Sequence, residues 1–396
     1  MKILSVNAGS SSLKFKAFEM PEEKVLASGV FERVGINNSF YRININGEKI
    51  EKQCELPDHK VAFGILVKEL LELKVIESFD EIKGVGHRVV QGADHYDKSV
   101  IATDEVVEDI KSLSSLAPLH NPAAVLGINA AKEVIPNAVH VVIFDTAFHQ
   151  TMEPKKYLYA VPYDWYKTYH VRKYGAHGTC HKYISSHMEK ILGTKESKLI
   201  VCHIGSGASI SAIKNGKVVD TSMGFTPNAG LIMGTRTGDI DASIIPYMME
   251  NAELSTSDIN TIINKSSGLL GISGKSDMRD VREGAADGDK ECRLALDMYV
   301  DRIVSYIARY YFELEGCDAI VFTAGVGENN SPTRKEVLEK LKFLGVELDE
   351  EKNETIVGFK EIHEGKITKD SSTIAAYVIP TDEEVMMARD VLDFIK

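Results

Sequence analysis

One strand–turn–strand pattern occurs twice in this chain, once near the start of each half. In residues 2–18, two β-prone runs flank a glycine and three consecutive serines, and residues 199–213 repeat this plan around Gly205-Ser206-Gly207. The spacing between Gly9 and Gly205 equals that between Ser10 and Ser206, 196 residues in both cases (205 − 9 and 206 − 10). A repeat that spans about half the chain predicts two related lobes.

Each of the two turns is a candidate phosphate site. Closely spaced backbone N–H groups and serine hydroxyls at a hairpin tip can hold an anion. In the first copy Lys14 adds a compact positive charge beside the turn, and Asn7 lies where the first strand ends. A single turn of this kind is equally well explained as an ordinary solvated hairpin. Because the pattern occurs twice, we favour two turns that close on one nucleotide from two lobes.

Composition limits the class of partner. The chain has 396 residues, 44% of them hydrophobic, and a formal net charge of −12, which favours two domains and argues against nucleic acid or an anionic membrane as partner. Five scattered cysteines without a CxxC pair predict neither a disulfide framework nor a zinc site. The sequence shows no signal-peptide core and no apolar run near the ~20 residues of a membrane span. A cytoplasmic protein is expected.

Hydrophobic periodicity predicts an α/β chain. Alternation predicts antiparallel sheet over residues 25–50, and further strands are predicted over 85–90, 139–144, 199–213, 319–323 and 373–380. Helices are predicted over 58–73, 104–116, 123–133, 244–250, 258–264, 290–315 and 382–394. Residues 146–174 look irregular, so we place the lobe boundary there. The predicted domains are an N-terminal lobe, residues 1–150 completed by the C-terminal helix 381–396, and a C-terminal nucleotide-binding lobe, residues 151–380.

Four residues are candidates because of their immediate surroundings. Asp145 ends a buried strand, where open α/β sheets place ligand contacts. Arg88 follows another strand and precedes Gln91-Gly92, which would leave its guanidinium free to hold a carboxylate; the alternative is a surface ion pair. Arg236 lies in a stretch too rich in glycine to be a helix, and His177 has a similar setting. A lone histidine is usually structural, but one flanked by glycines is harder to explain by packing.

Eight segments of the chain, taken together, resemble the acetate kinase family. They are Asn7 to Lys14, Gly86-His87-Arg88-Val89-Val90, Pro118-Leu119-His120-Asn121-Pro122, Phe144-Asp145-Thr146-Ala147-Phe148-His149, Tyr174-Gly175-Ala176-His177-Gly178-Thr179, residues 233–241 around Gly234-Thr235-Arg236-Thr237-Gly238, Gly325-Val326-Gly327-Glu328-Asn329 and Thr381-Asp382-Glu383-Glu384. Few of these segments are diagnostic singly. Taken together and in this order, the segments span essentially the whole chain, and the combination is highly specific for the family.

The resemblance implies a fold and a reaction. The implied fold class is α/β, with two duplicated lobes of the actin-like ATPase (ribonuclease H-like) fold and the nucleotide in the interlobe cleft. The implied reaction is reversible, Mg²⁺-dependent transfer of the ATP γ-phosphoryl group to acetate by direct in-line transfer, giving acetyl phosphate and ADP, with Mn²⁺ as an alternative ion. Since a carboxylate is already an adequate nucleophile, such a protein must chiefly bring two anions together and neutralise the group in transfer. A homodimer through the second lobe is also implied.

The resemblance also assigns roles to residues of this chain. The implied catalytic residues are Arg88, His120, Asp145, His177 and Arg236, although a role at the start of a helix is nearly as good an account of His120. The acetate pocket would be formed by Arg88, Val90, Leu119, Ala176 and Pro227. Nucleotide contacts are expected from Lys14, His203, Ile204, Gly205, Ser206, Gly207, Asp277, Met278, Arg279, Gly325, Val326, Gly327, Glu328 and Asn329, and metal ligands from Asn7 and Glu383.

Several alternatives stay open. A propionate kinase or a broad short-chain carboxylate kinase is the alternative enzyme, and a non-catalytic nucleotide-gated binding protein is the alternative from another class. Residues 268–276 mimic a Walker A loop but have five residues between Gly268 and Gly274, where the motif has four. The chain departs from the usual family pattern at Gln91, Ala93 and Cys180, and Ala176 stands where the family usually has an aromatic residue. The last departure bears on acyl-chain preference.

Overall fold

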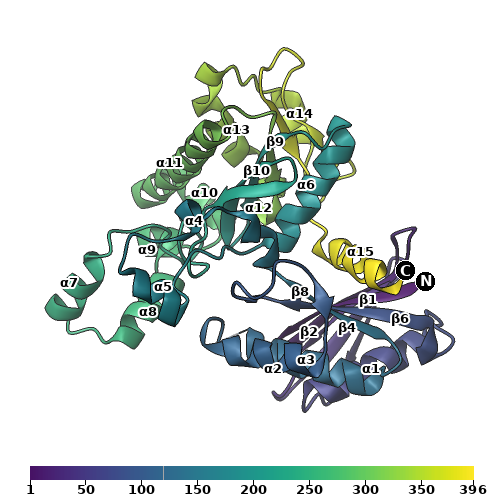
Figure 1. Cartoon of the computed structure of the whole chain (residues 1–396). Coiled ribbons are helices and arrows are strands. Elements are labelled where there is room, and N and C mark those ends of the chain that lie inside the picture. Colours follow the sequence, from purple (N-terminus) through teal and green to yellow (C-terminus); the bar gives the residue numbers. More distant parts are fainter. Residues whose placement is uncertain (119) are drawn as a thin grey trace. The chain divides into compact units, whose positions relative to one another are not determined.

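The computed structural model describes residues 1–118 and 120–396. It divides into two compact units: unit 1 comprises Met1–Gln150 and Asp382–Lys396, and unit 2 comprises Thr151–Thr381. Each unit is built on one mixed β-sheet with helices packed on it (Figure 1). Of the helices in the described ranges, none is both long enough and apolar enough to cross a membrane. Leu119, which was predicted to contribute to the acetate pocket, lies outside the described residues.

The described residues of unit 1 form an eight-stranded sheet, four α-helices and short 3₁₀ turns. Its strands are β1 (Lys2–Gly9), β2 (Ser12–Glu19), β3 (Lys24–Glu32), β4 (Phe40–Ile45), β5 (Glu48–Gln53), β6 (Ile82–Val89), β7 (Val100–Ile101) and β8 (Val139–Phe144). Its helices are α1 (His59–Glu72), α2 (Asp104–Ser112), α3 (Asn121–Val134) and α15 (Glu383–Ile395), and the 3₁₀ turns are η1 (Phe79–Glu81), η2 (Leu113–Ser115) and η3 (Ala147–Thr151), the last of which leads into unit 2.

Helices cover both faces of the unit 1 sheet. The buried residues of α1, such as Phe63 and Leu66, form one core with Val6, Phe15 and Val85 of the strands. On the opposite face α15 lies across the sheet (Figure 1). It approaches β6 so closely that a Cβ on Gly84 would lie 2.4 Å from Val391 Cγ1. The glycines of β6 are therefore required because the last helix of the chain packs directly on that strand.

Unit 2 contains a six-stranded sheet and the remaining helices. Its strands are β9 (Lys198–Ile204), β10 (Ala208–Lys214), β11 (Lys217–Thr221), β12 (Ala319–Thr323), β13 (Gly365–Lys366) and β14 (Ala375–Val378). Its helices are α4 (Pro154–Tyr157), α5 (Tyr163–Tyr169), α6 (Gly178–Leu192), α7 (Ile244–Asn251), α8 (Thr256–Lys265), α9 (Gly268–Ser273), α10 (Met278–Ala286), α11 (Lys290–Glu313), α12 (Ala324–Asn329), α13 (Ser331–Lys340), the 3₁₀ turn η4 (Lys342–Leu344) and α14 (Glu350–Thr355).

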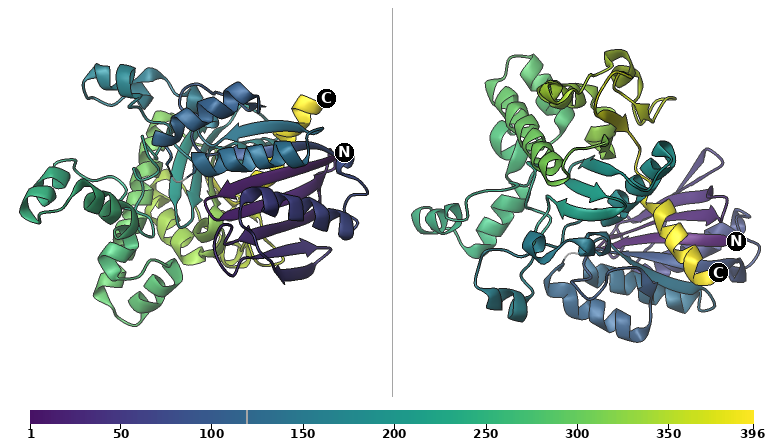
Figure 2. Two further views of the ribbon diagram at one scale, coloured as in Figure 1. Left: turned by 90° about the horizontal axis from the view of Figure 1, so that it is seen from below. Right: turned by 45° about the horizontal axis from the view of Figure 1, so that its top comes forward.

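The long helix α11 contributes much of the core of unit 2. Its buried residues, among them Leu296, Ile303 and Ile307, share one apolar cluster with Ile200 of β9 and Ile210 of β10. In both views of Figure 2, α5 and α7 lie at the outer end of unit 2, away from its sheet.

The two sheets have the same connectivity, so the predicted duplication is confirmed. In unit 1 the antiparallel strands β1, β2 and β3 are followed by β6, parallel to β1, and β8, parallel to β6. In unit 2 the antiparallel strands β9, β10 and β11 are followed by β12 and β14 in the same places. The turns differ by one residue, because Ala8 pairs with Leu13 whereas Ile204 pairs with Ala208. The offset of 196 before the turn becomes 195 after it (208 − 13).

The secondary structure differs from the prediction in several places. Residues 325–329, which were not predicted to form a helix, belong to α12, where Glu328 accepts a hydrogen bond from the N–H of Ala324. The segment 146–174 is not wholly irregular, since it contains η3, α4 and α5. The helices α6, α9, α10, α13 and α14 were not predicted; most are short, and packing in unit 2 rather than a long apolar period stabilises them.

Candidate active site

In unit 1 the site residues lie at the carboxyl ends of the parallel strands β1, β6 and β8. Val6 of β1 pairs with His87 of β6, and Arg88 pairs with Ile143 of β8, so Asn7, Arg88 and Asp145 follow at the same edge of the sheet. The backbone N–H of Asp145 donates to Val89 O at 2.9 Å, which fixes the residue just beyond β8. Open α/β sheets bind ligands at this edge, and here the register alone gathers the polar side chains.

Arg88 and Asp145 form a two-pronged ion pair. Nε of Arg88 lies 3.2 and 3.1 Å from the two carboxylate oxygens of Asp145, and Nη2 lies 2.7 Å from Oδ2. We predicted that the Arg88 guanidinium would be free to hold a carboxylate ligand. This prediction is wrong for Nε and Nη2, because both nitrogens donate to the buried carboxylate of Asp145. Among the described residues Nη1 has no hydrogen-bond partner. Asp145 and, less strongly, Glu383 raise the pKa of Arg88 against the opposing effect of burial.

Glu383 brings a second carboxylate to the same guanidinium. It is the first residue of α15, and its Oε2 lies 3.9 Å from Arg88 Nε. Burial is the largest influence on this carboxyl group; burial and the charge of Asp145 outweigh the attraction of Arg88 and raise the pKa of Glu383 to about 7. The attraction of Arg88 thus only partly offsets the cost of a charge on Glu383. Asn7, which follows Val6 at the same edge of the sheet, offers an amide oxygen, and oxygen donors of these kinds suit Mg²⁺.

Two lysines of β2 have different surroundings. Lys14 pairs with Asn7 across the β1–β2 ladder and is exposed, so its side chain emerges on the same face as Asn7. Lys16 forms ion pairs with Asp382 at 3.0 Å and Glu384 at 3.4 Å. Lys16 therefore holds the start of α15, which carries Glu383, against β2.

Unit 2 contains a cavity of about 480 Å³. Eight of the predicted nucleotide contacts line it: Gly205, Ser206, Asp277, Met278, Arg279, Gly325, Val326 and Asn329. His203, Ile204, Gly207, Gly327 and Glu328, all in the same segments, are not part of its lining. Asp277 caps α10 by accepting from the N–H of Arg279 and also pairs with the Arg279 guanidinium at 2.7 Å. Three segments far apart in the sequence, at residues 205–206, 277–279 and 325–329, thus meet around one space.

Six residues of the cavity lining were not predicted as nucleotide contacts: Gly234, Leu269, Ser276, Tyr299, Asn330 and Phe359. Leu269 and Ser276 belong to the segment 268–276, which was set aside because its spacing misses the Walker A pattern. Its glycine and serine content was the one signal that could have drawn attention to it. Nothing in the local sequence pointed to Tyr299 or Phe359.

The second Gly/Ser turn lies against an arginine and a histidine. A Cβ on Gly207 would lie 3.5 Å from Arg236 Nη1 and 3.8 Å from His177 Nε2. The turn itself is closed by the N–H of Gly205 donating to Gly207 O at 3.1 Å, and the N–H of Gly234 donates to Ser206 O at 3.2 Å. The structure therefore brings the turn, a predicted phosphate site, together with Arg236 and His177, two of the implied catalytic residues.

His177 has an unusual backbone conformation at the start of α6. Its φ of 60° is in the left-handed region, which a non-glycine residue adopts only at a cost. Its ring stacks on that of His203 with centroids 3.9 Å apart, and its Nδ1 lies 2.9 Å from Ser209 Oγ. These contacts fix the ring and leave Nε2 as the nitrogen nearer to Gly207.

Arg236 is held by a closed loop anchored on α11. The N–H of Asp239 donates to Gly230 O at 3.0 Å, and Arg302 Nη1 donates to the same oxygen at 2.9 Å. The hydroxyl of Tyr306 donates to Asp239 Oδ2. Gly238 has a φ of 67°, and a Cβ there would lie 2.4 Å from Leu231 O, so the loop requires glycine at this position.

The positive charge of Arg236 is not balanced by a carboxylate among the described residues. Nη1 donates to Pro227 O at 3.1 Å, and within the described part of the chain no carboxylate forms an ion pair with this side chain. Partial burial lowers the pKa of Arg236 from its ordinary value. A partly buried cation without an acidic partner is suited to an anionic ligand.

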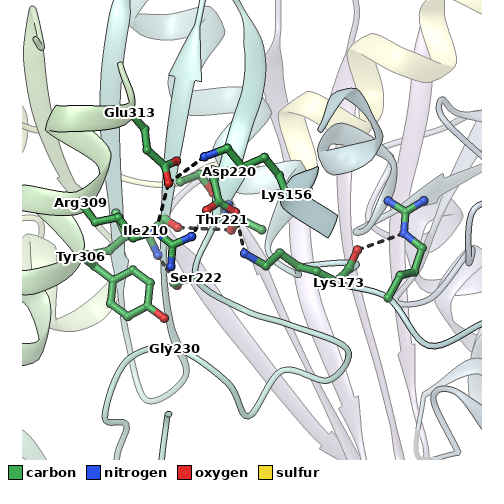
Figure 3. A network of polar contacts seen from close by, with 12 residues as sticks. Lys156, Lys173, Ile210, Asp220, Thr221, Ser222, Gly230, Tyr306, Arg309 and Glu313 are labelled. Carbon is green, nitrogen blue, oxygen red and sulfur yellow. Dashed lines mark hydrogen bonds and ion pairs between the residues drawn. The ribbon is translucent and has the colours of Figure 1, made fainter. Parts of the chain in front are cut away.

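A buried ion-pair network supports the segment that leads to His177 (Figure 3). The carboxylate of Asp220 accepts from Lys173 Nζ at 2.6 Å and Arg309 Nη2 at 2.8 Å, and it is fully buried. Glu313 joins the same network through Lys156 at 2.9 Å and Arg309 at 3.1 Å. Residues 156–173 are thereby tied to β11 and α11.

The remaining predicted residues have separate locations. In unit 1, His120 is exposed immediately before α3, and Val90 is half-buried immediately after β6. In unit 2, Ala176 is buried, and Pro227 provides the carbonyl group that holds Arg236. Cys180 is buried with its Sγ 3.1 Å from His203 Nδ1, so this departure from the family pattern contacts a predicted phosphate-binding residue.

Comparison with known proteins gives a consistent result. The family model described as the acetokinase family matches residues 2–389. Acetate kinase of Bacillus cytotoxicus is 50% identical over 394 residues, covering 99% of this chain and 98% of that protein. The crystal structure of Porphyromonas gingivalis acetate kinase has a TM-score of 0.95 at 42% identity and covers both chains completely. A propionate kinase from Francisella tularensis has a TM-score of 0.91 at 41% identity, covering 98% of each chain. Since the match runs through every segment that supplies the site residues, this chain belongs to the acetokinase family.

Proposed function

We propose that this protein transfers the γ-phosphoryl group of ATP reversibly to acetate, giving acetyl phosphate and ADP. The observation that carries the proposal is the match of nearly the whole chain, at about 50% identity, to relatives named acetate kinase. The geometry within each unit agrees with this chemistry, because each unit presents a partly buried arginine beside groups suited to binding an anion.

Unit 1 would handle the acceptor. Nη1 of Arg88 binds the carboxylate of acetate, while Asp145 holds the other edge of the guanidinium in a fixed orientation. An oxygen of acetate then attacks the γ-phosphorus, and the bond from that phosphorus to the oxygen bridging it to the β-phosphorus breaks in line. Because the acetate oxygen carries no proton, the reaction needs no general base.

Unit 2 would handle the donor. The nucleotide occupies the cavity of about 480 Å³, with its phosphates towards the turn at residues 205–207. Arg236 and His177, both adjacent to Gly207, stabilise the negative charge on the oxygens of the group in transfer. The closed loop at residues 230–239 keeps the arginine in place without an acidic partner that would compete for it.

A magnesium ion would be held by the oxygen donors of unit 1. Asn7 and Glu383 are the proposed protein ligands, with Asp145 close to the same guanidinium. When bound, Mg²⁺ neutralises phosphate charge and balances the carboxylates. The residues fit this role because the carboxylates of Asp145 and Glu383 lie close to one guanidinium and Arg88 only partly offsets the charge of Glu383.

Acetate is proposed over propionate on the relatives' names alone. The two solved structures with these two activities are 42% and 41% identical to this chain, so overall likeness does not separate them. Ala176 is a small residue at a position predicted to face the acyl group, and it makes propionate the second candidate substrate.

The protein is also proposed to act as a homodimer through unit 2. The helices α5 and α7 expose large apolar side chains, namely Tyr163, Trp165, Tyr169, Ile244 and Tyr247. Both helices lie at the outer end of the unit (Figure 2). Exposed aromatic clusters of this kind mark interaction surfaces. Light scattering after size exclusion should give twice the mass of the chain, and Trp165→Glu should reduce it.

The reaction is tested by trapping acyl phosphate with hydroxylamine in the presence of Mg-ATP. Acetate, propionate and butyrate are compared at several concentrations, and ADP release is followed in parallel. Acyl hydroxamate formed in step with ADP supports the proposal. ATP binding without acyl phosphate from any of these acids would favour the non-catalytic alternative, and kcat/KM higher for propionate than for acetate would favour a propionate kinase.

A further inference from the structure

Phe359 is an exposed aromatic residue on the wall of the unit 2 cavity. Phe359 is 74% exposed, whereas Leu269, Met278 and Tyr299 of the lining are at most 5% exposed and Val326 is half-buried. We infer that Phe359 stacks on the base of the bound nucleotide and so closes the open side of the cavity. This inference rests on the proposed function, because it takes the cavity to be the nucleotide site.

The segment that carries Phe359 is in close contact with α12. The N–H of Gly358 donates to Glu328 O at 3.3 Å. A Cβ on Gly358 would lie 2.8 Å from Glu328 Oε2 and 3.1 Å from Asn329 Oδ1, so a larger residue there would displace either these side chains or the segment. Asn329 is itself part of the cavity lining. The contact of Gly358 with α12 therefore places Phe359 at the cavity.

A buried arginine fixes both partners of this contact. Arg334 is fully buried, and its Nη1 donates to Gly327 O at 2.9 Å and Glu328 O at 2.8 Å. Its Nη2 donates to Ile356 O at 3.0 Å, two residues before Gly358. One guanidinium therefore links the carboxyl end of α12 to the start of the segment that carries Phe359.

The segment also has its own turn. The N–H of Lys360 donates to Val357 O at 2.8 Å, and the N–H of Val357 donates to Ile362 O at 3.1 Å. Phe359 lies at the tip of this turn. A tip held at both ends presents the phenyl ring in a defined place, so the ring loses little freedom when a ligand covers it.

The chemistry of the lining suits an aromatic base. Leu269 and Met278 offer an apolar surface, while Ser276 and Asn330 can hydrogen-bond to a base edge. A phenyl ring exposed to water beside such a space gains when a flat aromatic ligand covers it. Stacking of a base on an aromatic side chain is sequence-tolerant, because every base presents a π-face. Phe359 should therefore increase affinity for nucleotides in general, and its aromatic character should matter more than its size.

The first test measures ADP binding by titration calorimetry in wild type, Phe359→Ala, Phe359→Leu and Phe359→Tyr. We expect the Ala and Leu variants to bind ADP about tenfold more weakly and the Tyr variant to match wild type, in line with measured base–aromatic stacking. Phe343→Ala is the matched control, because Phe343 is 80% exposed in the same unit and is not part of the cavity lining. Its ADP affinity should equal that of wild type.

The second test separates the base from the phosphates. Binding of tripolyphosphate, which has no base, should be the same in Phe359→Ala and wild type. Equal loss of affinity for ADP and tripolyphosphate would overturn the stacking role, as would an unchanged ADP affinity in Phe359→Ala. A wild type that does not bind ADP would instead contradict the proposed function. In a Trp165→Phe background, which removes the one native tryptophan, the indole of Phe359→Trp should be quenched by ADP and not by tripolyphosphate.

Discussion

Arg88 uses two of its three guanidinium nitrogens to bind both carboxylate oxygens of Asp145, from 2.7 to 3.2 Å away. The pair joins the end of β6 to the residue after β8 and leaves Nη1 of the arginine for a ligand. The arginine therefore neutralises a buried carboxylate, and in the proposed function it also binds acetate.

Arg88→Ala should reduce both turnover and stability. Loss of preorganised charge at a transferring group costs roughly 10²-fold or more in rate. Breaking a buried ion pair by removing one partner costs about 3–5 kcal/mol, with the lower end expected because the arginine is 23% exposed. Urea unfolding and initial rates should be measured together. An inactive variant with wild-type stability would show that the ion pair contributes little to folding.

Arg236→Ala should lose turnover without losing stability. No carboxylate among the described residues pairs with this side chain, so its removal leaves no buried charge behind. We expect kcat to fall by about 10²-fold or more while the unfolding midpoint stays within error of wild type. Arg293→Ala, on the exposed side of α11, is the control for removing one positive charge. Near-normal turnover in Arg236→Ala would exclude this arginine from the site.

Asp220→Asn should strongly destabilise unit 2. It removes the fully buried carboxylate that Lys173 and Arg309 share (Figure 3). The expected loss is about 3–5 kcal/mol in the free energy of unfolding. Asp297→Asn is the matched control, because its partner Arg293 is one turn away on an exposed helix surface, where such pairs contribute about 0.5 kcal/mol or less. Equal effects of the two substitutions would contradict the role of the network.

The buried pair His87 and His140 should make stability fall in mild acid. His87 Nε2 lies 3.0 Å from His140 Nδ1, and His140 Nε2 lies 3.0 Å from Ile135 O. The second contact requires N–H at His140 Nε2, so His140 Nδ1 accepts from His87. Burial, followed by the charge of the neighbouring groups, lowers the pKa of His87 well below 6.5, and burial also lowers the pKa of His140.

The direction in which stability changes with pH follows from proton binding. In the unfolded chain both histidines take up protons below about pH 6.5, whereas the native rings stay neutral, so stability decreases as the pH falls below that value. Each histidine contributes a slope of up to about 1.4 kcal/mol per pH unit. Urea unfolding at pH 7.5, 6.5 and 5.5 should show this loss, and His140→Gln should reduce the slope. A slope unchanged in the variant would show that other groups cause the acid sensitivity.

Ala176→Phe should sharpen the preference for acetate. Ala176 is buried in the cluster that includes Met223 and Ile232, and its methyl group is smaller than the aromatic ring that the family usually has there. One methylene in an apolar pocket changes discrimination by about 1–3 kcal/mol. We expect wild type to use propionate within tenfold of acetate in kcat/KM, and the Phe variant to discriminate more strongly. Rejection of propionate by tenfold or more in wild type would mean that Met223 or another neighbour already fills the space.

The sequence alone determined the features that depend on local spacing. The duplicated Gly/Ser turns, the strands that flank them and the amphipathic period of α11 are visible because each is set by residues close together in the chain. The candidate residues Asp145, Arg236 and His177 could be selected for the same reason, since strand ends and glycine-rich surroundings are local properties. Their roles came from the family resemblance, and they remain proposals.

The contacts among these groups depend on the three-dimensional packing of the chain. Arg88 and Asp145 are 57 residues apart, and their pairing depends on the register of β6 with β8, which no local pattern encodes. The cavity of unit 2 joins segments from residue 205 to residue 359, including Leu269 and Ser276, whose spacing had counted against them. Phe359 gave no signal in the sequence, because its place at the cavity depends on Gly358 and on the hydrogen bonds of Arg334 to α12. Contacts of this kind depend on packing between distant segments, and a one-dimensional pattern of residue types does not specify them.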